Sequence, residues 1–104
     1  MTTKYSQLSR ATKYILRGQL IESCAYFEKY IRAPLIGLLR LLHTPRHIDY
    51  GTVHISHHLP AADLRRLEAL YRIGSIDDIR AALPAADALF DDVCARLRQK
   101  YGWA

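Results

Sequence analysis

Apolar side chains recur every three or four residues through the first part of the chain. The series runs Leu16, Leu20, Cys24, Phe27, Ile31, Leu35, Leu38 and Leu42. This spacing places one apolar stripe along a helix, so residues 1–42 are predicted to form one long helix or two helices in line. Pro34 lies inside the pattern and removes a backbone donor, which should kink or split the helix near Arg32 and Ala33.

The helical spacing stops at His43 and returns only after Leu59. Thr44-Pro45 should end the first helix, and Asp49-Tyr50-Gly51 is typical of a turn. Residues 52–56 alternate between polar and apolar side chains, as a short extended piece does. We therefore expect an irregular connection over residues 43–59.

Three shorter helices are predicted after this connection. Pro60 suits the first turn of a helix over residues 60–73, which Gly74 should terminate. Ser75 and Asp78 match a capping box that would start a helix over residues 75–83, and Pro84 should open a last helix over 84–101. The expected fold is an all-α helical bundle, a single domain over residues 1–104.

The composition fits this picture, because half of the 104 residues are apolar, enough for one core. Charged side chains interrupt every apolar run before the roughly 18–20 residues that span a bilayer, so no membrane segment is expected. The first residues lack the apolar stretch of a signal peptide, and Cys24 and Cys94 stand alone. These features predict a cytoplasmic protein with reduced thiols.

The net charge of +5 lies in the first half of the chain, where residues 1–58 hold eight Lys or Arg against three acidic residues. A basic half can indicate a nucleic-acid partner. Lys4, Arg10, Lys13 and Arg17, however, are spread along a predicted helix rather than clustered with aromatic side chains. A solvated helix face is favoured, and a basic nucleic-acid-binding module stays as an alternative.

All five histidines fall within sixteen residues, from His43 to His58. His43 and His47 are four residues apart, and His54 and His57 are three apart, spacings that suit metal ligands on a helix. Pro45 disfavours helix across the first pair, and no suitable third ligand follows. We expect no metal site.

Arg40 and His47 have six residues between them, which resembles the arginine–histidine pattern of helical HEPN-type ribonucleases. In that chemistry the histidine transfers a proton and the arginine holds charge at a scissile phosphate. Thr44-Pro45 interrupts the helix that the pattern needs. A HEPN-type ribonuclease or toxin that uses Arg40 and His47 is therefore the alternative enzyme hypothesis.

A resemblance to a known family covers roughly residues 11–98, and the ordered motifs that carry it run from His43 to Asp78. They comprise His43, Pro45, Asp49, Gly51, His54, Leu59-Pro60, Leu67-Glu68, Leu70-Tyr71 and Ser75-Ile76-Asp77-Asp78. This series resembles the helical C-terminal region of bacterial nucleotidyltransferase-domain proteins of the polymerase-β-like superfamily. The catalytic module of that family carries a Gly-Ser turn followed by a D-x-D pair. This sequence has no D-x-D pair, and its one Gly-Ser dipeptide, Gly74-Ser75, is followed by the adjacent acids Asp77-Asp78.

The resemblance implies a non-catalytic accessory domain, for substrate binding or dimerisation, that packs against a nucleotidyl-transfer module in cis or in trans. Magnesium and the nucleoside triphosphate would belong to that module, so no cofactor and no catalytic residue are expected in this chain. The long helix could also form a homodimer through its stripe, or pack on the chain's own later helices. The candidate substrate-binding residues are His43, Arg46, His47, Asp49, Tyr50, His54, His57 and His58.

Overall fold

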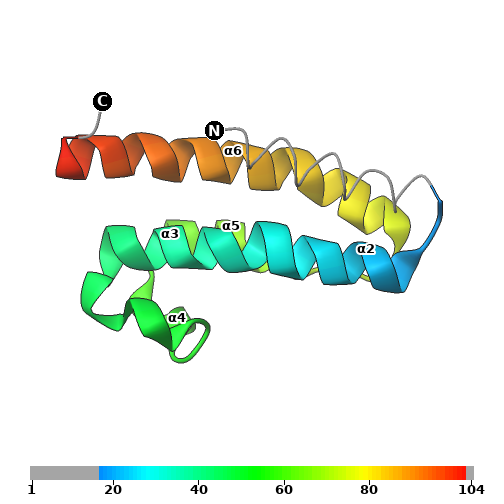
Figure 1. Ribbon diagram of the computed structural model, residues 1–104, viewed down its shortest axis with the longest axis horizontal. Coiled ribbons are helices and arrows are strands. Elements are labelled where there is room, and N and C mark those ends of the chain that lie inside the picture. Colours follow the sequence, from blue (N-terminus) through cyan, green and yellow to red (C-terminus); the bar gives the residue numbers. More distant parts are fainter. Residues whose placement is uncertain (1–16, 103–104) are drawn as a thin grey trace.

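The computed structural model describes residues 17–102, and the regular elements within this range are all helical (Figure 1). In chain order they are α2 (Leu20–Phe27), the π-helical turn η1 (Glu28–Arg32), α3 (Ala33–His43), the 3-10 helix η2 (Pro45–Tyr50), α4 (Ile55–His58), α5 (Ala61–Ala69) and α6 (Ile76–Tyr101). The predicted all-α fold is confirmed.

Two long helical units run side by side in the same direction (Figure 1). The first unit is α2, η1 and α3, and the second is α6. At their shared end, the Lys100 ammonium of α6 donates to the Leu42 carbonyl of α3 at 2.5 Å, and the Tyr101 hydroxyl donates to the Leu41 carbonyl at 3.1 Å. The last carbonyls of a helix have no partner within it, so α6 caps the end of α3.

α5 runs back against α3. The first turn of α5 carries Asp63, which binds His43 at the end of α3. Leu70, the residue just after α5, accepts a hydrogen bond from Arg32 at 3.2 Å. The predicted helix over residues 60–73 is accordingly shorter and ends at Ala69. Because Arg32 binds the Leu70 carbonyl, the chain leaves the helix at that point and turns towards α6.

The core lies between α6, the first helical unit and α5. Its buried apolar side chains are Phe27, Ile31, Leu35, Ile36, Leu39, Leu42, Leu59, Leu67, Leu70, Ile79, Ala82, Ala86, Leu89, Val93 and Leu97. The predicted stripe thus packs within the chain from Phe27 onwards, and Leu16 lies outside the described residues. A homodimer is not needed to cover the stripe. Between residues 17 and 102, no helix has both the length and the apolar content to cross a membrane.

The irregularity predicted near Pro34 takes the form of the π-helical turn η1. The Ala33 amide donates to the Glu28 carbonyl, five residues back. An α-helix would need an amide hydrogen at residue 34, which proline lacks, and the proline ring would crowd the preceding turn. The wider turn accommodates Pro34 while the backbone stays helical on both sides.

The two helices predicted over 75–83 and 84–101 form one continuous helix, so that prediction is wrong. α6 contains Pro84, with buried residues on both sides of it: Ile79, Ala82, Ala86, Leu89, Val93 and Leu97. Their spacing keeps one apolar face on the core across the proline, and this packing outweighs the missing hydrogen bond. The start of α6 was predicted correctly, because the Asp78 amide donates to the Ser75 hydroxyl at 3.1 Å.

The substitution Pro84→Ala tests this continuity. Alanine would restore an amide donor for the Arg80 carbonyl inside α6, so we expect a gain in the free energy of unfolding of about 1–3 kcal/mol. The measurement is the thermal unfolding midpoint, with Pro60→Ala as the control because Pro60 lies just before α5. A midpoint that stays the same or falls would indicate that two separate helices meet at Pro84.

Candidate functional site

The connection (residues 43–59) is organised around Arg40 of α3, a charged side chain with 0% exposure. Its Nε donates to the Gly51 carbonyl at 2.9 Å, and Nη2 donates to the Val53 carbonyl at 2.6 Å. Nη1 donates to the Thr44 hydroxyl at 3.3 Å and lies 2.5 Å from Nδ1 of His58. A buried cation must be hydrogen-bonded, and here backbone carbonyls and a histidine take the place of a carboxylate.

The backbone of the connection follows from these bonds. Gly51 adopts φ +57° and ψ −118°, a conformation that favours glycine, and His54 adopts φ +59°. Residues 52–54 are therefore a turn, and α4 begins at Ile55, so the extended piece predicted over residues 52–56 is wrong. The alternation of side chains could not show that Arg40 binds the Gly51 and Val53 carbonyls and so bends the chain.

Four of the predicted site residues come together beside Arg40. His47 stacks on His58 with ring centroids 5.4 Å apart, and Tyr50 lies 4.6 Å from His47. His54 contacts His58 at 6.1 Å, and the Arg40 guanidinium lies 5.9 Å from the Tyr50 ring. We call His47, Tyr50, His54 and His58 the ring cluster.

His58 has to be neutral to accept a hydrogen bond from Arg40 at Nδ1. Partial burial, the Arg40 charge and then the neighbouring His47, His54 and His57 lower the pKa of His58 below its ordinary value. The ring cluster is thus a layer of stacked side chains over a buried cation. Its contacts with Arg40 and between its own rings help to hold the connection in this conformation.

His43 points away from the ring cluster, to a separate ionic network. Its Nε2 lies 2.7 Å from a carboxylate oxygen of Asp63, and Arg96 of α6 donates to both oxygens of that carboxylate, at 2.9 and 3.0 Å. Bonding to Arg96, opposed by burial and aided by His43, holds the pKa of Asp63 below its ordinary value. This network joins α3, α5 and α6.

The remaining predicted residues lie on the outside of the connection. Arg46 and His57 are exposed. Asp49, Tyr50, Val53 and His54 line an open hollow of about 400 Å³. Among residues 17–102, no group of three or more His, Cys, Asp or Glu side chains could hold a metal ion. Of the basic residues considered for nucleic-acid binding, Lys4, Arg10 and Lys13 lie outside the described residues.

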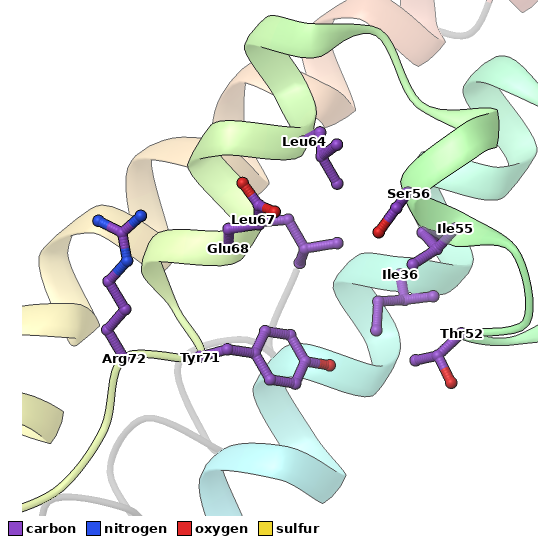
Figure 2. A pocket seen from close by; sticks show the side chains of 9 residues that line it. All are labelled: Ile36, Thr52, Ile55, Ser56, Leu64, Leu67, Glu68, Tyr71 and Arg72. Atoms are coloured by element: carbon purple, nitrogen blue, oxygen red, sulfur yellow. The ribbon is translucent and has the colours of Figure 1, made fainter.

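The larger pocket lies on the other side of the connection, between α3, α4 and α5, with a volume of about 410 Å³. Figure 2 shows the residues that line it, which are Ile36, Thr52, Ile55, Ser56, Leu64, Leu67, Glu68, Tyr71 and Arg72. None of the eight predicted substrate-binding residues is among them. The part of the lining that falls within residues 17–102 contains no histidine, cysteine or aspartate.

Tyr71 lies at one end of this pocket, and its ring packs against Arg32. The guanidinium of Arg32 lies 4.3 Å from the centre of the Tyr71 ring and 2.6 Å from the Glu28 carboxylate. Burial and the Glu28 charge raise the pKa of Tyr71, so its hydroxyl stays protonated. Arg32 belongs to η1, and the π-helical turn therefore supports a wall of the pocket.

The sequence contains one signal for Arg40 and little for the pocket. Arg40 follows Ile36 by one helical turn, so a charged residue falls at the buried edge of an apolar stripe. The pocket draws on residues as far apart as Ile36 and Arg72. No local pattern joins them, because tertiary packing alone brings α3, α4 and α5 to one place.

No protein-family model, curated protein or solved structure matches this chain. The resemblance to nucleotidyltransferase-domain proteins therefore rests on the ordered sequence motifs. The fold is a small all-α domain. In it, Arg40 holds the connection by hydrogen bonds, and an apolar pocket lies beside the connection.

Replacing Arg40 by methionine tests whether the guanidinium shapes the connection. Methionine keeps much of the buried volume but leaves the Gly51 and Val53 carbonyls without their donor. We expect a loss of about 1–3 kcal/mol in the free energy of unfolding and faster amide hydrogen exchange over residues 44–58. Arg46→Met, at an exposed position, is the matched control. Unchanged exchange in the connection would contradict this role of Arg40.

The lowered pKa of His58 predicts a pH dependence of stability. Below about pH 6.5, the ordinary pKa of histidine, the unfolded chain binds a proton that folded His58 still excludes. Stability should therefore be complete above that pH and fall as the pH drops below it. Thermal unfolding midpoints between about pH 8 and pH 5 should decline more for the natural protein than for His58→Gln. His57→Gln is the control, and equal slopes in all three proteins would refute the prediction.

Proposed function

We propose that this chain is a non-catalytic helical accessory domain that acts with a nucleotidyl-transfer module and contributes to binding of the acceptor substrate. The observation that carries this proposal is the pocket between α3, α4 and α5. It is largely apolar, it has a polar rim, and within residues 17–102 its lining includes no histidine, cysteine or aspartate. Such a concavity suits the binding of a small molecule rather than covalent chemistry by this chain alone.

Several of the residues that carry the nucleotidyltransferase resemblance stabilise this fold by hydrogen bonding, burial or helix capping. His43 binds Asp63, and Gly51 supplies both a carbonyl and a positive φ to the bend around Arg40. Leu59 is buried in the core, and Ser75 caps α6. Residues with such roles are the ones that a shared helical scaffold would require. The motif series therefore supports kinship of fold, and the accessory role follows by analogy.

The ribonuclease hypothesis finds less support in this geometry. It requires an arginine that can hold a phosphate beside His47. Arg40 is fully buried, and its Nε, Nη1 and Nη2 all take part in hydrogen bonds within the protein. A phosphate could reach this guanidinium only if the connection opened.

The accessory role predicts a complex with a nucleotidyl-transfer module. The full chain is mixed with a module that is encoded next to it and carries the Gly-Ser turn and the D-x-D pair. We expect the two to co-elute in gel filtration, and we expect more transfer of labelled nucleotide than the module gives alone. Ser56→Trp should fill the pocket, keep the complex and lower transfer roughly tenfold or more. Arg65→Ala, at an exposed position on α5, is the matched control.

Two results would refute the proposal. One is the absence of both co-elution and added transfer. The other is cleavage of total RNA by the natural protein that is lost in His47→Ala, which would favour the ribonuclease instead. We expect that neither the natural protein nor His47→Ala cleaves RNA.

A further inference from the structure

The pocket has an apolar floor large enough for a ring or a short hydrocarbon body. Ile36 of α3, Ile55 of α4, and Leu64 and Leu67 of α5 surround it (Figure 2). Its volume of about 410 Å³ falls within the range of small-molecule sites in proteins. Apolar area is therefore available for the body of a ligand.

Among the described residues, Glu68 is the only acidic one that lines the pocket, and none of them offers its carboxylate an ion pair or a hydrogen bond. Figure 2 shows this carboxylate beside Leu64 and Leu67, whereas the Arg72 guanidinium extends away from the other lining side chains. A protein with a net charge of +5 thus places an acidic side chain that has no partner within residues 17–102 next to an apolar concavity. That arrangement is complementary to a cation attached to an apolar body.

Hydroxyl groups complete the polar rim. The Ser56 hydroxyl points inward from α4, and the Tyr71 ring closes the end of the pocket opposite Leu64 (Figure 2). Tyr71 stays protonated and is held by Arg32, so it can donate or accept a hydrogen bond without reorganising. Neither of these two groups adds charge. Of the two charged lining residues, Glu68 and Arg72, it is Glu68 whose charged group lies beside the apolar floor (Figure 2), so we take its carboxylate to set the sign of the preferred ligand.

We propose that this pocket selects organic amines, and that Glu68 binds the protonated amine while the floor receives an apolar or aromatic body. The proposal rests on the accessory function above and names the class of acceptor that the domain would bind. Ser56 and Tyr71 then offer hydrogen bonds to further polar groups of the ligand. An anionic ligand with the same body would meet the Glu68 charge and be rejected.

Three probes with the same phenyl body test this selectivity on the full chain, namely phenethylamine, phenethyl alcohol and phenylacetate. Nuclear magnetic resonance titrations should show that phenethylamine shifts amides around the pocket at the lowest concentration, phenethyl alcohol at higher concentration, and phenylacetate not at all. Glu68→Gln should weaken phenethylamine binding roughly tenfold and leave the alcohol unchanged. Glu22→Gln, on the exposed side of α2, is the matched control.

Equal binding of the three probes, no binding of phenethylamine, or an unchanged affinity in Glu68→Gln would overturn the amine assignment. The gel-filtration experiment with the nucleotidyl-transfer module needs no amine, so the two proposals fail separately. Loss of amine binding with an intact complex refutes the ligand class alone. Amine binding without a complex refutes the accessory function alone.

Discussion

The buried guanidinium of Arg40 is the interaction on which the connection depends. Removing an arginine from water is costly unless its hydrogen bonds are replaced, and the partners that Arg40 has among the described residues all lie outside α3. The acceptors for its hydrogen bonds include the carbonyls of Gly51 and Val53 and Nδ1 of His58. Residues 44–58 have to wrap around one point, which sets the positions of both the ring cluster and the pocket wall.

The same constraint links the pocket to the rest of the bundle. Thr52, Ile55 and Ser56 form one wall of the pocket, and their backbone is placed by the bonds of Arg40 on either side of Thr52. The opposite wall belongs to α5, which the network of His43, Asp63 and Arg96 fixes against α3 and α6. The pocket is therefore preformed between two anchored elements rather than enclosed by a free loop.

Sequence patterns predicted the helices well wherever burial repeats along one face. They failed where the outcome depended on what lies across from a residue, and the two internal prolines show why. Pro34 and Pro84 both interrupt an apolar period, yet one is accommodated by a π-helical turn and the other lies inside one continuous helix. Buried residues lie on both sides of each proline, so the apolar pattern alone does not distinguish the two outcomes.

The eight residues predicted to bind substrate lie within residues 43–58, and none of them lines the pocket beside this segment. The histidines of the sequence are concentrated in residues 43–58. In the structure, several side chains of this segment pack around the buried guanidinium of Arg40. The adjacent pocket is lined by aliphatic side chains together with Thr52, Ser56, Glu68, Tyr71 and Arg72. Leu67, Glu68 and Tyr71 belong to the motif series, but no local pattern joins them to Ile36 or Ile55. A segment rich in titratable groups can thus be the support of a site while ligand contacts fall to the residues it positions. In the proposed site, the hydrogen bonds of Arg40 fix the connection, and Glu68 is proposed to supply the charge that a ligand meets.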